Sequence, residues 1–358
     1  MKKTAVLILA VCLFIPSAAF ACTDFALKAK DNTVINGRSM EFPIDLKSEV
    51  LIVPRGVQHT CTDNKGVKGA SWTSKYGFLG ISAFGIKDCL VEGFNEKGLT
   101  VGGLVFGGAE YQKAVNGIFI PVDRLAAWIL GNFATVEDVK AALPKVTVCE
   151  PDIKKLKSLG MHIAVHDAAG KNLVIEFVGG KVNVYDNPVG VMTNSPDFPW
   201  MITNLRNYIN LDSLNRAPKT LDSVRIEPTG VGSGLLGLPG DWTPPSRFVR
   251  MAICKDAALK PKNAKEAINL AEHLLNIVDI PKGVIKEKPE PFITMYGYAQ
   301  WVIIKDLTNK VLYYKTYDNS AWKSVDLKKF DLRPGTPIKS LSIDSNYLSV
   351  TDVSEQLK

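Results

Sequence analysis

The chain has 358 residues, of which 46% are hydrophobic and 22% are charged, which is ordinary for a globular protein with a large core. Its formal net charge is +7, a mild value for this length, and the lysines are spread along the chain. No block of Lys and Arg marks a nucleic-acid site, so we expect no nucleic-acid partner.

Residues 1–21 have the pattern of a secretory signal peptide. Lys2 and Lys3 give a positive start, residues 5–15 form an apolar run, and Ala19-Phe20-Ala21 matches the small-x-small pattern of a cleavage site. The run is too short for a transmembrane helix, and no later run is long enough. We therefore predict a cleaved signal over 1–21, a single mature domain over 22–358, a periplasmic or secreted location, and no stable membrane insertion.

Alternating apolar and polar residues that end in turn signals predict strands and hairpins along most of the chain. Residues such as Asn95 and Gly98 supply the turns. The predicted strand segments cover 23–29, 49–56, 76–85, 89–106, 161–185 and 311–319.

Helices are predicted where apolar residues recur at helical spacing, over 121–130, 135–143, 199–209, 245–257 and 263–278. Thr135 with Asp138 three residues later has the pattern of a capped start, and Pro144 ends the same segment. The segment 281–292 is predicted to connect a helix to the last strands. Because helices follow groups of strands and do not alternate with them, the pattern favours an α+β fold with antiparallel sheets.

Six cysteines are present, and Cys12 would leave with the signal. The five that remain are an odd number, so at least one is free or paired between chains, and the pairing of the other cysteines (Cys61, Cys89, Cys149, Cys254) cannot be assigned. The sequence contains no Cys-x-x-Cys motif. His162 and His166 share one face of a predicted strand without a supporting glutamate, so we expect no metal site.

Cleavage after Ala21 would make Cys22 the N-terminal residue, with a thiol and a free α-amine on one Cα. An α-amine has a pKa of about 7.7–8.0, so it can accept the thiol proton near neutral pH. One residue would then supply both a nucleophile and its base.

Three other interpretations of Cys22 remain open at this point. The residue could be lipidated, although Ala19 stands where a lipidation signal usually has leucine. It could form half of a disulfide, or it could be a buried strand cysteine without a chemical role.

Several further motifs decide how this cysteine is interpreted, and they occur in a fixed order along the chain: NGRSMEF (36–42), LIVPRG (51–56), VMTNSPDFPWMITNLRNY (191–208) and GLPGDWTPPSRFVR (237–250). With Cys22, they resemble the choloylglycine hydrolase family of N-terminal nucleophile hydrolases, which groups conjugated bile salt hydrolases and penicillin V acylases. The resemblance runs from Cys22 to about Asp318. It implies a four-layer αββα sandwich and hydrolysis of a small-molecule linear amide, without a metal or organic cofactor. A homotetramer is usual in such a family.

The resemblance also suggests roles for individual residues. Cys22 matches the nucleophile, and Arg38 lies beside it, where a guanidinium would favour the thiolate. Glu41 stands where the family usually has an aspartate that holds the α-amine. Asn194 matches the asparagine that stabilises the tetrahedral oxyanion, and Arg247, 53 positions later, would orient the nucleophile or its acidic partner.

Two further positions concern the substrate. The backbone N–H of Val105 matches the second oxyanion donor, but valine replaces the residues that usually hint at substrate preference. Phe42 would line the pocket. The departures at Glu41 and Val105 leave an alternative function open, namely a non-catalytic periplasmic binding protein, possibly lipid-anchored, on the same fold.

Overall fold

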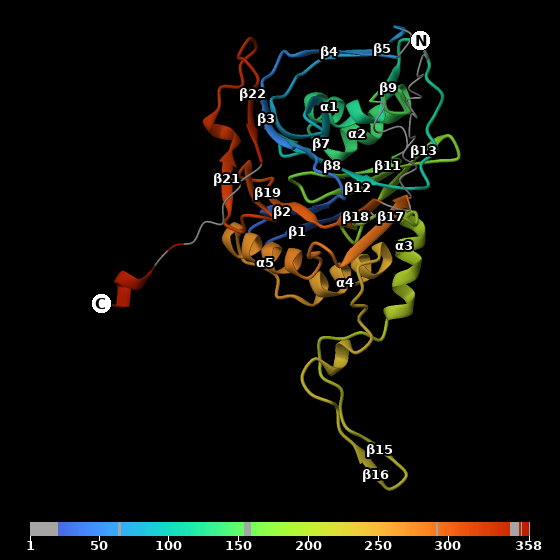
Figure 1. Cartoon of the computed structure of the whole chain (residues 1–358), viewed down its shortest axis with the longest axis vertical. Coiled ribbons are helices and arrows are strands. Elements are labelled where there is room, and N and C mark those ends of the chain that lie inside the picture. The colour runs from blue at the N-terminus through green and yellow to red at the C-terminus, as the bar shows by residue number, and fades with distance from the viewer. Residues whose placement is uncertain are drawn as a thin grey trace, which may run out of the picture.

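A computed structural model of the protein describes residues 21–63, 66–153, 159–290, 293–343, 351 and 353–357. The predicted signal peptide lies outside the described residues except for Ala21. Two large antiparallel sheets form the centre of the molecule, and helices cover their outer faces (Figure 1). The fold is therefore the four-layer α+β sandwich that the sequence predicts.

One central sheet has six strands and carries the N-terminal segment. Its order is β14 (Val191–Met192), β1 (Thr23–Lys28), β2 (Val34–Glu41), β19 (Ala299–Asp306), β20 (Val311–Thr316) and β21 (Lys323–Asp326). All eight residues of β2 are buried, because this strand has a neighbour on each side, a helix on one face and the second sheet on the other. Polar residues on this strand are therefore shielded from bulk water, and any hydrogen bonds they form are with groups inside the protein.

The second central sheet has eight strands. Its order is β13 (Lys181–Asp186), β12 (Asn172–Val178), β11 (Met161–His166), β8 (Thr100–Val105), β7 (Ile86–Asn95), β6 (Phe78–Ala83), β3 (Glu49–Val53) and β22 (Lys339–Ser342). The predicted strand segments 89–106 and 161–185 form five of these strands. Strands β7 and β8 form a hairpin, β11 to β13 form two successive hairpins, and β8 pairs antiparallel with β11.

Helices α1 (Val122–Asn132) and α2 (Val136–Ala142) lie on the side of the eight-stranded sheet, and α1 packs on β7 and β8. Helices α3 (Phe198–Asn204), α4 (Pro244–Ala257) and α5 (Ala264–Asn276) lie on the other side, where α5 packs on β2 and β19. The Thr135 side chain caps α2 in a capping box with Asp138, as the sequence predicts. No helix within the described residues is both long enough and apolar enough to cross a membrane.

Four two-stranded pairs complete the fold: β4 (Gln58–Thr62) with β5 (Lys68–Thr73), β9 (Phe119–Pro121) with β10 (Thr147–Cys149), β15 (Lys219–Leu221) with β16 (Val224–Ile226), and β17 (Ile285–Glu290) with β18 (Ile293–Gly297). Short 3-10 turns occupy Leu143–Lys145, Leu205–Tyr208, Ser233–Leu235, Leu327–Lys329 and Ser354–Leu357. The β15–β16 pair lies at the tip of an arm that extends away from the sandwich (Figure 1).

The β17–β18 hairpin corrects one prediction, because the segment 281–292 is expected only to connect a helix to later strands. Along β17, Ile285 and Glu287 are half-buried while Lys286 and Lys288 are exposed. The segment does alternate as a strand should. Its alternation is hidden in the sequence because a charged residue occupies one of the half-buried positions.

Candidate active site

Cys22 lies immediately before β1, in the space between the two sheets, and only 1% of its surface is exposed. Its backbone N–H donates a hydrogen bond of 2.8 Å to Oδ1 of Asn194. Its Sγ lies 3.5 Å from Nη2 of Arg38 and 3.8 Å from Sδ of Met40. The main chain and the sulfur of this residue are thus fixed by separate partners.

Arg38 reaches the sulfur because β1 and β2 pair antiparallel with Asp24 opposite Arg38. Its Nη2 also donates to the carbonyl oxygen of Gly103 at 2.6 Å, and its Nε lies 3.1 Å from Oε2 of Glu92. The planar guanidinium therefore has contacts at both ends, which fixes its orientation.

Arg247 lies in the first turns of α4 and fixes the main chain of the cysteine. Its Nη1 donates to the Cys22 carbonyl oxygen at 2.6 Å and to Oγ1 of Thr23 at 2.7 Å. Its Nη2 donates to Oδ1 of Asn194 at 2.8 Å. Arg250, one turn later, bonds to backbone carbonyls such as that of Ile277, which is a structural arrangement.

Asn194 follows β14 and joins both sheets to the cysteine. Its Oδ1 accepts the bonds from Cys22 and Arg247, and its Nδ2 donates to the Val105 carbonyl oxygen at 2.8 Å. The preceding carbonyl, that of Thr193, lies 2.9 Å from Nε2 of His162. The structure therefore brings Asn194 and Val105 together beside Cys22, while their roles as oxyanion donors stay predictions.

Glu41 ends β2 and is completely buried. Neither of its carboxylate oxygens has a hydrogen-bond partner among the described residues. Burial raises the pKa of Glu41 to about 7, although the charge of Arg247 opposes this shift. The N–H of Cys22 donates to Asn194 and not to Glu41. In this unprocessed chain the nitrogen of Cys22 still belongs to the peptide bond with Ala21 and is not an α-amine. The predicted contact of Glu41 with a free α-amine is therefore untested.

The thiol pKa of Cys22 is raised and not lowered in this chain. Burial is the dominant cause, and the negative charge of Glu41 adds to it, whereas the charges of Arg38 and Arg247 act in the opposite direction. The expected influence of Arg38 thus has the right sign, but burial outweighs it.

A small pocket of about 30 Å³ adjoins the cysteine, and its walls are apolar. Phe42, predicted to line such a pocket, is one of its wall residues and meets Phe84 edge to face, with ring centroids 5.9 Å apart. The pocket is lined by Cys22, Met40, Phe42, Leu46, Phe84, Val91, Gly103, Val105, Leu159 and Met161.

The structure also reveals buried polar residues that the sequence analysis missed. Glu92, Lys305 and Asp24 lie between the sheets, close to Arg38. A signal was available for two of them, because Glu92 and Lys305 directly follow apolar runs (residues 89–91 and 301–304) in the buried parts of their strands. A buried charge of this kind usually has a partner.

Disulfides and metal sites are both absent from the described part of the chain. Cys22 and the other four cysteines there (Cys61, Cys89, Cys149 and Cys254) are free thiols. Cys22 therefore forms no disulfide with another described residue of this chain. The described part of the chain contains no cluster of three or more His, Cys, Asp or Glu side chains placed to hold a metal ion.

Comparison with known proteins places this site in a family. Residues 22–351 match the profile of the linear amide C–N hydrolases, choloylglycine hydrolase family. The chain belongs to this family. It is therefore a hydrolase that acts on linear amides, and the match begins at Cys22.

Two curated relatives are bile salt hydrolase/transferases. The protein from Clostridium perfringens is 34% identical, and the alignment covers 93% of this chain and 100% of the relative. The protein from Lactiplantibacillus plantarum is 32% identical, with 86% of this chain and 92% of the relative covered.

Solved structures agree with this assignment. A variant of conjugated bile acid hydrolase from Clostridium perfringens superimposes with a TM-score of 0.82 at 32% identity, covering 93% of this chain and 100% of that chain. Penicillin V acylase from Agrobacterium tumefaciens gives a TM-score of 0.75 at 24% identity, covering 92% of this chain and 94% of that chain. The second likeness concerns the fold alone.

Proposed function

We propose that removal of residues 1–21 activates this choloylglycine hydrolase family member by exposing Cys22 as an N-terminal nucleophile. The observation that carries the proposal is the placement of Cys22. Its sulfur faces Arg38, its nitrogen faces Asn194, and its carbonyl is held by Arg247. The start of the family match at residue 22 supports the same N-terminus.

In the proposed reaction, the α-amine of Cys22 takes the thiol proton and the thiolate attacks the carbonyl carbon of the amide. Nδ2 of Asn194 and the N–H of Val105 stabilise the oxyanion. When the C–N bond breaks, the protonated α-amine gives its proton to the leaving amine, and a thioester remains. The α-amine then takes a proton from water, and the resulting hydroxide displaces the thiolate from the acyl group.

Glu41 and Arg247 would assist by holding the α-amine and the main chain of the nucleophile. Glu41 has no hydrogen-bond partner for its carboxylate among the described residues. Cleavage would place the ammonium group of the new N-terminus nearby, as a partner of opposite charge for this buried carboxylate. Buried charges are usually stabilised by such a partner.

The substrate proposed is a conjugated bile salt or a penicillin V-like N-acyl compound. The apolar walls around Phe42 favour an apolar acyl group beside the cysteine. Relatives at more than 30% identity are named for bile salts. The small pocket must widen for such an acyl group, and the side chains of Phe84 and Met161 are candidates for the movement.

Export to the periplasm or the medium follows in this proposal from signal cleavage, since the same cut that targets the protein also creates the nucleophile. We also propose assembly into a homo-oligomer, as expected for a family in which tetramers are usual. The arm that carries β15 and β16 supports this, because it extends from the sandwich (Figure 1) and exposes apolar side chains such as Val224 and Val231.

The proposal is tested with the secreted, processed protein under reducing conditions. Glycocholate, taurocholate, penicillin V and a long-chain acyl-homoserine lactone are offered separately, and the released amine, acid or lactone product is quantified. Intact mass first establishes that Cys22 is the free N-terminal residue. We expect turnover of a bile salt or of penicillin V.

The matched control is Cys22→Ala, in which we expect no turnover, a retained fold by circular dichroism, and the same intact N-terminus. Appreciable hydrolysis by this variant would contradict the proposed nucleophile. A lipid adduct on Cys22, or substrate binding without turnover by the free processed protein, would favour the binding-protein alternative.

A further inference from the structure

A layer of charged side chains lies between the two sheets, directly behind Arg38. Arg38 and Lys305 come from neighbouring strands of the six-stranded sheet, and Glu92 comes from β7 of the eight-stranded sheet. None of the three has measurable exposure. Because a buried charge without a partner is strongly unfavourable, the stability of this layer depends on how its charges are paired.

Glu92 is the centre of the pairing. Its Oε2 lies 3.1 Å from Nε of Arg38, and its Oε1 contacts Nζ of Lys305. Nζ of Lys305 also donates to Oγ1 of Thr100 at 2.7 Å. One carboxylate thus bridges two cations, and the hydroxyl of Thr100 fixes the second of them.

The other end of Arg38 points to the cysteine. While its Nε is paired with Glu92, its Nη2 lies 3.5 Å from Sγ of Cys22. A single rigid guanidinium therefore connects the thiol to Glu92 and, through Glu92, to Lys305. Negative charge on Glu92 that Lys305 does not offset opposes the effect of the Arg38 charge on the sulfur.

We propose that Glu92 and Lys305 are positioning residues for Cys22. In this arrangement Glu92 holds the guanidinium of Arg38 against the sulfur, and Lys305 offsets the charge of Glu92, so that the positive charge of Arg38 stays available to the thiolate. The inference rests on Cys22 being the nucleophile of the proposed function. Beyond that function, thiolate formation at Cys22 then depends on the Glu92–Lys305 ion pair, although neither of these side chains contacts the sulfur.

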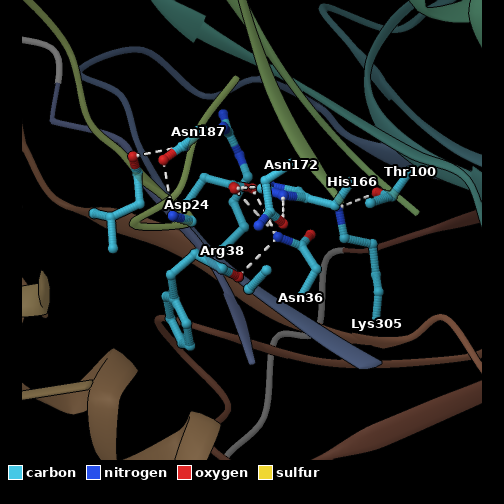
Figure 2. A network of polar contacts seen from close by, with 12 residues as sticks. Asp24, Asn36, Arg38, Thr100, His166, Asn172, Asn187 and Lys305 are labelled. Atoms are coloured by element: carbon cyan, nitrogen blue, oxygen red, sulfur yellow. Dashed lines mark hydrogen bonds and ion pairs between the residues drawn. The ribbon is translucent and has the colours of Figure 1, made fainter. Parts of the chain in front are cut away.

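The other charged groups that face this layer have their own partners. Asp24 of β1 lies 2.6 Å from Nε2 of His166 and accepts a bond of 3.1 Å from Nδ2 of Asn36, as Figure 2 shows. Burial acts to raise the pKa of Asp24, but the charge and hydrogen bond of His166, together with the charges of Lys305 and Arg38, lower it to about 2. The direct contact of Asp24 is thus with His166, and Glu92 is the carboxylate in direct contact with Lys305.

On the opposite side of the cysteine, Glu41 and Arg247 also act on the thiol. Neither of them contacts Glu92 or Lys305 in the described structure. Their influence is constant when Lys305 is changed, so a substitution at Lys305 isolates the layer behind Arg38.

The test measures thiolate formation directly and does not depend on turnover. The processed protein is alkylated with iodoacetamide from pH 5 to pH 10, and modification of the Cys22 peptide is followed by mass spectrometry. We expect Lys305→Met to shift the midpoint of this profile upward by about one pH unit, which is about a tenfold slower reaction below the midpoint. Lys305→Arg should restore the midpoint.

A double-mutant cycle separates action through Glu92 from a general loss of positive charge. We expect Lys305→Met to have little further effect on the midpoint in a Glu92→Gln background, because the charge that Lys305 offsets is then absent. Equal shifts in both backgrounds, or no shift in either, would overturn the proposal.

Two further variants keep the test decisive if Lys305→Met folds poorly. Thr100→Val removes only the hydroxyl that fixes Lys305 and should give a smaller shift in the same direction. Lys255→Met is the matched control, because Lys255 donates to the Ala26 carbonyl at 3.0 Å and does not contact Glu92. A shift as large with Lys255→Met as with Lys305→Met would also overturn the proposal. Absence of turnover with normal alkylation profiles would instead count against the proposed function alone.

Discussion

Glu41 is a buried carboxyl group whose titration affects the stability of the fold. Its pKa is raised from 4.5 to about 7, chiefly by burial. Between these two values the folded chain keeps the proton while the unfolded chain has lost it. Because the folded state then binds more protons, the free energy of unfolding falls as the pH rises from about 4.5 to about 7, and the loss is complete above that range.

We therefore predict a difference between the unprocessed chain, in which the nitrogen of Cys22 is still a peptide group, and its Glu41→Gln variant. Over this pH range the free energy of unfolding should fall by up to about 3 kcal/mol more in the unaltered chain than in the variant. Urea denaturation of both proteins at pH 5, 6, 7 and 8 measures the difference. Parallel pH profiles for the two proteins would show that Glu41 titrates normally in the fold.

Asn194 is the residue on which we expect the oxyanion to depend most. Asn194→Asp keeps Oδ1 as an acceptor for Cys22 and Arg247 but removes the Nδ2 donor. We predict that kcat falls by about 10²–10³-fold with a much smaller change in KM, measured with the substrate that the processed protein turns over.

Asn187→Asp is a suitable control for this substitution. Asn187 is also buried, and its Nδ2 donates to the Val191 carbonyl at 3.0 Å, but it has no contact with Cys22. Its replacement should lower thermal stability and leave kcat nearly unchanged. Similar losses of kcat in both variants would mean that Asn194 acts only through the fold.

At the scale of single elements, β8 matters because its glycines let the sheets approach each other. A Cβ on Gly102 would lie 3.0 Å from Oε2 of Glu92 and 3.4 Å from Nη1 of Arg38. The structure shows that Gly102 leaves room for the Arg38–Glu92 pair.

Gly102→Ala should therefore disturb the layer behind Arg38 with only a moderate loss of stability, about 1–3 kcal/mol. We predict a loss of turnover much larger than this destabilisation explains, measured as kcat at a temperature where the variant is fully folded. Gly240→Ala is the control, since nothing lies within 4 Å of a Cβ at that position. Normal kcat in Gly102→Ala would contradict this role for β8.

The sequence predicted most elements because their cause is local. Helix α2 follows from the Thr135 cap, and β1, β7 and β8 follow from alternation, whereas β2 was not among the predicted strands. Arg38, Asn194 and Arg247 were recognised from motifs and do gather around Cys22.

The contacts of Glu92 and Lys305 could not be predicted, because they depend on how two sheets far apart in sequence are stacked. The raised pKa of the Cys22 thiol was missed for the same reason, since it depends on the final degree of burial.

At the scale of the whole molecule, the two hydrophobic clusters explain where chemistry can occur. One cluster includes Phe25 and Phe248, while the other fills the space between the eight-stranded sheet and α1. The space between the sheets, which the first cluster lines, also holds the buried charged side chains of Arg38, Glu92 and Lys305. The rigid apolar surroundings keep those charges out of water, which makes their pairing strong.

The arm around β15 and β16 gives the last prediction. Its apolar side chains are exposed, with Val231 at 96% and Val224 at 60%, and a surface of this kind usually meets a partner. The base of the arm is held by the Asp212 N–H, which donates to the Gly234 carbonyl at 3.0 Å, and by the Gly232 N–H, which donates to Oδ1 of Asn215 at 2.7 Å. Residues 217–230 can therefore be replaced by a short Gly-Ser linker without removing these bonds.

We predict that this replacement lowers the mass measured by size-exclusion chromatography with light scattering, from an oligomer to a smaller species, and leaves the melting temperature of the sandwich nearly unchanged. Changing Leu221, Val224 and Ile226 together to serine keeps the length of the arm and should have the same effect, because the apolar surface and not the chain length would drive association. If the unaltered protein is a monomer, or if both variants keep its oligomeric mass, the arm is not an interface between copies of this chain.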